Sequence, residues 1–137
     1  MNLLGIREPH FYGTQTLLDL DESLRQLASE LRVDLECRQT NSEGTLLDWL
    51  EQAPAVCDGI VLNPAGLTHT SRVLGEAVAA SKVPTVEVHM SNIHAREEWQ
   101  QISYVAPEAV GVLSGLGAES YLLGLRGLVT HLRKVRW

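Results

Sequence analysis

The sequence predicts an α/β protein whose strands form a parallel sheet. Apolar segments of strand length alternate with amphipathic segments of helix length, as expected for repeated βαβ units. One apolar segment, over residues 59–62, stops at Asn63 and Pro64, because proline ends regular structure. The chain has 137 residues, 45% hydrophobic and 20% charged, which suits a single domain over residues 1–137.

The clearest helix is expected over residues 17–31. Leucines recur there at helical spacing, at Leu17, Leu20, Leu24, Leu27 and Leu31. Thr16 can cap the helix, and Asp19 follows three residues later in capping-box position. The preceding residues contain Gly5, Pro9 and Gly13, which disfavour regular structure. We therefore expect a loop followed by an amphipathic helix.

Four strands and three further helices complete the predicted order. Strands are expected over residues 33–38, 59–62, 84–89 and 109–113, because the first alternates apolar and polar residues and the others are short apolar runs. Helices are expected over residues 42–52, 70–81 and 117–135, and the second should bury Val73, Leu74, Ala77 and Val78. The alternation of strands and helices implies right-handed βαβ units and therefore a parallel sheet. Such sheets bind ligands beyond the carboxyl ends of their strands.

The composition excludes several classes of protein. The net charge of −6 argues against a nucleic-acid binder, which needs a basic face, although a few arginines can still form a pocket for a small anion. The apolar runs are too broken for a membrane span, and the N-terminus does not resemble a signal peptide. We therefore expect a cytoplasmic protein in which Cys37 and Cys57 are buried free thiols.

Glu87 and His89 form a candidate acid–base pair. They lie two residues apart in a predicted strand, so their side chains point to the same face. A carboxylate bonded to one ring nitrogen fixes the tautomer and raises the basicity of the other nitrogen, as a general acid requires. The alternative is a strand-end histidine that simply finds a hydrogen-bond partner in its neighbour.

Two polar loops follow predicted strands. Residues 63–71 offer backbone amides and hydroxyls for an anion or a polyol, or else form an ordinary βα loop with a helix cap at Thr68, Thr70 or Ser71. In residues 91–97 the Ser91 and Asn92 amides could hold a carboxylate, with Arg96 as the counter-charge. The alternative for this second loop is a solvated segment with an Arg–Glu surface pair.

The N-terminal segment contains Arg7 and Tyr12. Tyrosine is a poor base because its unperturbed pKa is about 10, but a nearby guanidinium favours the phenolate. The stretch between Gly5 and Gly13 could be a mobile lid, or alternatively a disordered arm. His69, His89 and His94 do not form a tight metal-binding pattern with the cysteines, and the glycine fingerprints of phosphate or dinucleotide sites are missing. The residues therefore make metal binding a weak interpretation.

These clusters together resemble the type II dehydroquinase family. The similar segments cover residues 2–5, 7–9, 12–13, 41–44, 48–49, 63–64, 68–71, 87–97, 115–118 and Tyr121. They span nearly the whole chain in the family's order, and the segments 68–71 and 87–97 are specific. The resemblance implies a flavodoxin-like three-layer sandwich and a homo-oligomer, a dodecamer built from trimers. It also implies a lyase of the shikimate or quinate pathway that dehydrates 3-dehydroquinate to 3-dehydroshikimate without a cofactor and serves aromatic amino acid biosynthesis.

The resemblance assigns roles to individual residues. Tyr12 as phenolate takes the proton next to the substrate ketone, Arg7 keeps Tyr12 ionised, and an enolate forms. His89, oriented by Glu87, then protonates the departing hydroxyl. The remaining assignments concern binding: Asn63, His69 and Arg96 for hydroxyls, Ser91 with the Asn92 and Ile93 amides for the carboxylate, and Glu76 where an aspartate reaches a neighbouring subunit's site.

The chain departs from the family pattern at a few places. Family members begin with an apolar strand before the segment that matches residues 1–5, so we expect the first, central strand to be absent. Ala65 and Leu67 stand where glycine and tyrosine are common, and Gln100 replaces a usual arginine. A non-catalytic member that binds a polyol acid or acts as an oligomeric partner is the alternative function. An unrelated flavodoxin-like regulatory domain would need acidic residues at strand ends, which the sequence lacks.

Overall fold

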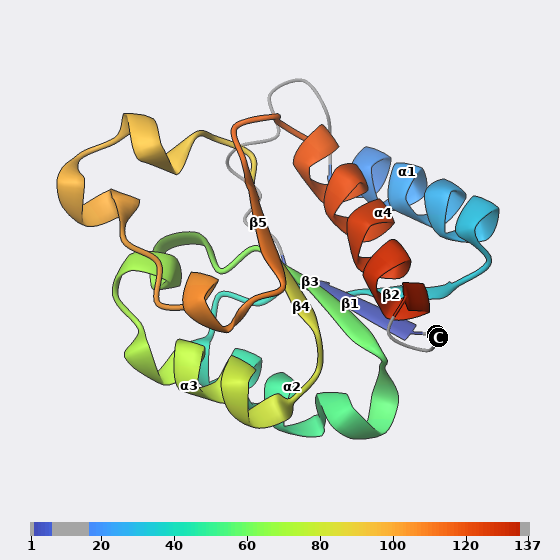
Figure 1. Cartoon of the computed structure of the whole chain (residues 1–137), viewed down its shortest axis with the longest axis horizontal. Coiled ribbons are helices and arrows are strands. Elements are labelled where there is room, and N and C mark those ends of the chain that lie inside the picture. The colour runs from blue at the N-terminus through green and yellow to red at the C-terminus, as the bar shows by residue number, and fades with distance from the viewer. Residues whose placement is uncertain (1, 7–16, 135–137) are drawn as a thin grey trace.

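The computed structural model describes residues 2–6 and 17–134, in which strands and helices alternate (Figure 1). The strands are β1 (Asn2–Ile6), β2 (Asp34–Cys37), β3 (Gly59–Leu62), β4 (Thr85–His89) and β5 (Gly111–Ser114). The helices are α1 (Leu17–Leu31), α2 (Glu43–Val56), α3 (Arg72–Ser81) and α4 (Glu119–Lys134). Short 3-10 helices are η2 (Ala65–His69), η3 (Ile93–Ala95), η4 (Glu98–Gln101) and η5 (Ala106–Glu108). The predicted α/β class is confirmed.

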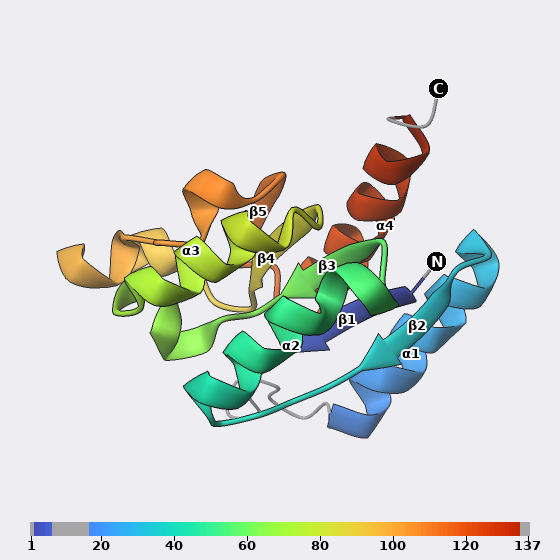
Figure 2. The same ribbon diagram turned by 90° about the horizontal axis from the view of Figure 1, so that it is seen from below.

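The structure corrects one expectation about the sheet. We expected the central strand to be missing, but within the described residues the order is β2-β1-β3-β4-β5, with β1 in its place (Figure 2). β1 runs parallel to both neighbours, and Leu4 is paired with Glu36 on one side and Ile60 on the other. Backbone groups rather than side chains form a ladder, so a five-residue segment containing a glycine is sufficient.

Two hydrophobic clusters lie on opposite faces of this sheet. Val61 belongs to the cluster with α1 and α4, whereas Ile60 and Leu62 belong to the cluster with α2 and α3. Consecutive side chains of a strand point to opposite faces, so β3 must be apolar at every position. The result is the three-layer arrangement seen in Figure 1, with the sheet between the two helix pairs.

The helices follow the predicted positions with small differences at their ends. α1 begins and ends as expected, because Leu20, Leu24 and Leu27 form its buried side. α2 continues past Gln52 to Val56 even though Pro54 removes one hydrogen bond, because the preceding turns are anchored in the core. None of the helices in the described part of the chain is both long enough and apolar enough to cross a membrane.

The expected burial of Val73 is wrong, since its side chain is 54% exposed. Leu74 and Val78, four residues apart, lie on the side of α3 that faces the core. Val73 precedes this pair by one position and is therefore rotated about 100° away from it around the helix axis. Apolarity alone did not identify the buried side of this helix.

Gly75 allows α3 to approach the segment that follows η4. A Cβ added at this position would lie 2.1 Å from the Tyr104 carbonyl oxygen, a backbone atom that no side-chain rotation can move. We expect Gly75→Ala to lower the free energy of unfolding by about 1–3 kcal/mol, measured by urea denaturation. As a control, Gly127→Ala on α4 adds a Cβ with no atom within 4 Å and should raise stability by about 0.4–1 kcal/mol. Equal stability of the two variants would contradict the close approach.

Neither cysteine forms a disulfide, and both are partly buried rather than buried as expected. Burial raises the pKa of the Cys57 thiol above its usual value, and the thiol donates to the Ala53 carbonyl oxygen at 3.4 Å. A thiol with a raised pKa is mostly protonated at neutral pH and is a weak nucleophile. Cys57 is therefore a structural residue of the α2 end.

Candidate active site

A cleft of about 270 Å³ lies beyond the carboxyl ends of β3 and β4. Parallel sheets bind ligands at this edge, where the strand ends bring their loops together. The cleft is lined by Asn63, Ala65, Gly66, His69, Thr70, His89, Met90, Ser91, Arg96, Trp99 and Gln100. Five of the predicted site residues are therefore brought together: Asn63, His69, His89, Ser91 and Arg96.

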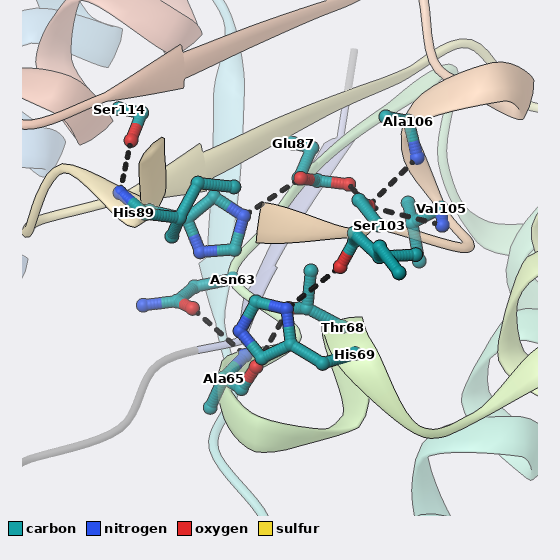
Figure 3. Close-up of polar contacts among 12 residues, drawn as sticks. Asn63, Ala65, Thr68, His69, Glu87, His89, Ser103, Val105, Ala106 and Ser114 are labelled. Atoms are coloured by element: carbon teal, nitrogen blue, oxygen red, sulfur yellow. Dashed lines mark hydrogen bonds and ion pairs between the residues drawn. The ribbon is translucent and has the colours of Figure 1, made fainter. Parts of the chain in front are cut away.

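Glu87 and His89 form the buried pair that their spacing predicted. Nε2 of His89 lies 2.7 Å from Oε2 of Glu87, and the two residues are 5% and 0% exposed. An ionised carboxylate only accepts hydrogen bonds, so Nε2 carries the proton of this bond. The other nitrogen, Nδ1, is then an acceptor in the neutral ring and a donor in the charged ring. Figure 3 shows it on the side of the ring that faces Asn63 and His69.

Ser103 contacts the same carboxylate and was not among the predicted residues. Its hydroxyl donates to Oε1 of Glu87 at 2.6 Å, so both oxygens of this fully buried carboxylate have partners. Ser103 lies sixteen positions beyond Glu87, in the segment between η4 and η5. A serine at such a separation follows no helix or strand period, so the sequence carries no signal for this contact.

His69 has its tautomer set by a backbone carbonyl. Nδ1 lies 2.7 Å from the Ile102 carbonyl oxygen, which only accepts, so Nδ1 carries the proton. Nε2 is then free of a proton and can accept a hydrogen bond from a hydroxyl group in the cleft. The ring also stands edge-on to Trp99, with centroids 5.9 Å apart at 86°, and Trp99 forms an apolar wall beside it.

Asn63 is held between two partners at the end of β3. Its Nδ2 donates to the Tyr121 hydroxyl at 2.8 Å, and its Oδ1 accepts from the Ala65 amide at 2.9 Å. One N–H of the amide group therefore points to Tyr121, and the second lies at the cleft. The turn places Ala65 at φ 51°, in the left-handed region that favours glycine. Tyr121 is buried and orients Asn63 from α4.

The loop that follows ends at a helix cap. Among the candidates, Ser71 is the residue that caps α3, because its hydroxyl oxygen accepts from the Leu74 amide at 3.0 Å. Thr68 is buried and donates instead to the Ala65 carbonyl oxygen at 2.6 Å. Thr70 lines the cleft. The loop is thus both a helix start and one wall of the cleft.

The second polar loop places Ser91 and Arg96 in the cleft, where Nη2 of Arg96 donates to the Ser91 hydroxyl. The structure does not bring Asn92 and Ile93 to the cleft wall. The Asn92 side chain accepts from the His94 amide at 3.0 Å, and the Ile93 amide donates to the Ser114 hydroxyl at 3.1 Å. The Ile93 amide therefore has a hydrogen-bond partner within the chain, and the role of this amide in binding a carboxylate stays a prediction.

Three further predicted residues are not among those that line the described cleft. Glu76 is exposed on α3 and lines surface depressions outside the cleft. Arg7 and Tyr12 lie outside the described residues. Between residues 17 and 134, no group of three or more His, Cys, Asp and Glu side chains is placed to hold a metal ion. The described cleft thus offers one buried acid–base pair, a second histidine, an amide and a guanidinium.

Comparison of the sequence with known proteins identifies the family of this chain. A sequence model described as dehydroquinase class II matches residues 1–129. The chain belongs to the class II dehydroquinase family. The match covers every residue that forms the described cleft, and the resemblance stated from the sequence is confirmed.

Named relatives and a solved structure agree with this family. A 3-dehydroquinate dehydratase from Geotalea daltonii is 52% identical over 134 residues, which cover 98% of this chain and 93% of the relative. A protein of the same name from Desulforudis audaxviator is 56% identical over 129 residues, 94% of this chain and 86% of the relative. The crystal structure of type II dehydroquinase from Propionibacterium acnes has a TM-score of 0.84 and 37% identity, covering 95% of both chains. The flavodoxin-like fold of class II dehydroquinases is therefore the fold of this chain.

Proposed function

We propose that this class II dehydroquinase is a lyase that removes water from 3-dehydroquinate to give 3-dehydroshikimate, a step of the shikimate pathway. The observation that carries the proposal is the buried Glu87–His89 pair, whose second ring nitrogen faces a cleft lined by polar side chains. Elimination of water needs an acid at the departing hydroxyl and donors that hold a polyhydroxylated acid. The cleft offers both kinds of group in a volume suited to a small molecule.

His89 acts as the general acid in this proposal. The Glu87 carboxylate accepts a hydrogen bond from Nε2–H of His89. When the ring is doubly protonated, the proton available to the substrate is therefore the one on Nδ1. The negative carboxylate stabilises the imidazolium that must be present before the transfer. After the proton moves to the departing hydroxyl, His89 returns to the neutral Nε2–H form without rotation of the ring.

Tyr12 is proposed as the base, with Arg7 as the cation that keeps it ionised. The backbone supports this assignment up to Ile6, which is paired with Leu62, and Leu62 directly precedes Asn63 of the cleft. Ile6, which directly precedes Arg7 in the sequence, is therefore paired with the residue next to Asn63. Removal of the proton next to the ketone gives an enolate, which expels the hydroxyl when His89 protonates it.

The cleft walls suit the rest of the substrate. Nε2 of His69 accepts from one substrate hydroxyl, because its Nδ1–H is used by Ile102. The second amide N–H of Asn63 donates to another oxygen. We assign the substrate carboxylate to the end with Ser91 and Arg96, where a guanidinium supplies the counter-charge.

We further propose a cytoplasmic homo-oligomer, a dodecamer built from trimers, in which Glu76 reaches the cleft of a neighbouring subunit. Glu76 is exposed on α3 and outside its own cleft, so it can act on substrate only from another copy. Carboxylates at a subunit boundary can accept hydrogen bonds from hydroxyls of a bound polyol.

Turnover of 3-dehydroquinate is the experiment that tests this function. We expect the purified chain to convert it to a conjugated product, followed by the rise of ultraviolet absorbance. A protein-free sample and heat-denatured protein serve as controls. Binding of 3-dehydroquinate by calorimetry without any absorbance change would contradict the enzyme and support the non-catalytic alternative.

A further inference from the structure

The hydroxyl of Ser103 has all of its hydrogen-bonding positions filled. Its oxygen accepts from the Val105 amide at 3.2 Å and from the Ala106 amide at 3.0 Å, and it donates to Oε1 of Glu87 at 2.6 Å. A hydroxyl group has one proton and two lone pairs. Because the two amides occupy the lone pairs, the single proton is directed at Glu87 (Figure 3).

The segment that carries Ser103 is itself held against the cleft. The Tyr104 amide donates to the Thr68 carbonyl oxygen at 3.0 Å, and the Ile102 carbonyl accepts from His69 at 2.7 Å. Neighbouring residues of one segment thus contact both the β3 loop and the β4 carboxylate. The backbone is therefore held on both sides of Ser103, and turning its side chain away from Glu87 would break the bonds from the Val105 and Ala106 amides.

Glu87 needs two donors because it is fully buried. A hydrogen-bond donor at each oxygen offsets the hydration that a buried carboxylate has lost. With Oε1 held by Ser103, Oε2 is the oxygen that faces Nε2 of His89 as an acceptor.

We propose that Ser103 is a positioning residue, which acts through Glu87 to keep His89 in the Nε2–H form with Nδ1 toward the cleft. Its effect on turnover rests on the proposed dehydratase function, whereas its effect on the tautomer does not. Ser103 does not touch the cleft itself, so substrate binding should not depend on it.

The test uses three variants of the full chain. Ser103→Ala removes the hydroxyl, and Ser103→Thr restores it. Ser81→Ala is the matched control, because Ser81 is a buried serine whose oxygen accepts from the Val83 amide at 3.2 Å and donates to the Val78 carbonyl oxygen at 2.7 Å, away from the cleft. The measurements are kcat and KM for 3-dehydroquinate and the ¹⁵N side-chain spectrum of His89, assigned by its loss in His89→Gln.

We expect Ser103→Ala to lower kcat by about ten- to a hundredfold, the scale of one hydrogen bond to a charged group, with KM unchanged. The ¹⁵N spectrum of His89 should lose the Nε2–H pattern. Ser103→Thr should restore both, and Ser81→Ala should change neither. If Ser103→Ala does not fold, the Ser103→Thr variant decides the matter, since loss of the Nε2–H pattern with its hydroxyl in place overturns the proposal.

Other outcomes separate this proposal from the proposed function. A wild-type spectrum with the Nε2–H pattern that survives in Ser103→Ala overturns the positioning role, whatever the turnover. A wild-type chain without turnover refutes the dehydratase, yet the tautomer comparison still decides the role of Ser103. Equal losses of kcat in Ser103→Ala and Ser81→Ala would mean that the effect is general destabilisation, which also overturns the proposal.

Discussion

His89→Gln is expected to lower kcat for 3-dehydroquinate by about 10²–10⁴-fold, the usual contribution of a general acid. Glutamine is close to histidine in length and can still donate a hydrogen bond, so KM should change little. It cannot release a proton to the departing hydroxyl, because an amide N–H is not an acid at neutral pH. Steady-state kinetics at saturating substrate measure the change.

Solvent exchange gives this prediction a sharper control. In His89→Gln the proposed base, Tyr12, is unchanged. The enolate should therefore still form, and the proton next to the ketone should exchange with deuterium even though water is not eliminated. Tyr12→Phe should lose both exchange and elimination. Exchange that disappears in His89→Gln but persists in Tyr12→Phe would reverse the assignment of acid and base.

Glu87→Gln is the second change with a large expected effect. The Ser103 hydroxyl can only donate to Glu87, so the new amide must turn its oxygen to Ser103 and its NH₂ group to His89. Nε2 of His89 then faces a donor and cannot keep its proton, and the imidazolium has lost its acceptor. We expect kcat to fall by about 10³–10⁴-fold, the scale observed when a carboxylate that orients a catalytic histidine becomes an amide.

Glu43→Gln is the matched control for this experiment. Glu43 also accepts a hydrogen bond from a serine, with Ser71 Oγ at 2.5 Å from its Oε1, but this pair links the starts of α2 and α3 outside the cleft. Its kcat should equal that of the wild type. A Glu87→Gln variant with wild-type kcat would refute the role of Glu87 in orienting the acid.

The spacing of apolar residues correctly predicted those helices and strands whose burial follows a simple repeat in the sequence. The leucines of α1 were placed correctly because this helix buries one side. The unbroken apolar run of β3 was placed correctly because this strand is buried on both faces. Val73 was placed wrongly because it is apolar but lies beside, rather than on, the side of α3 that Leu74 and Val78 bury. β1 was not anticipated, since its position depends on ladders to β2 and β3 that no local pattern encodes.

The candidate site divides in the same way. Glu87 and His89 could be paired from the two-residue period of a strand, and the polar loops could be placed at strand ends. Ser103, the Ile102 carbonyl and Tyr121 reach the site from distant parts of the chain, through contacts that depend on tertiary packing. Sequence spacing therefore identified the side chains that are proposed to react, but it missed the groups that hold them in place.

The bonds that run from two backbone amides through Ser103 and Glu87 to His89 are complete before any substrate arrives. In water, charge that shifts during a reaction must reorient the surrounding solvent dipoles, and this reorganisation adds to the activation barrier. In this protein the dipoles around His89, the proposed acid, are oriented by folding, once for each molecule rather than once for each turnover. The folding of the loop around Ser103 therefore also sets the orientation of the proposed acid, His89.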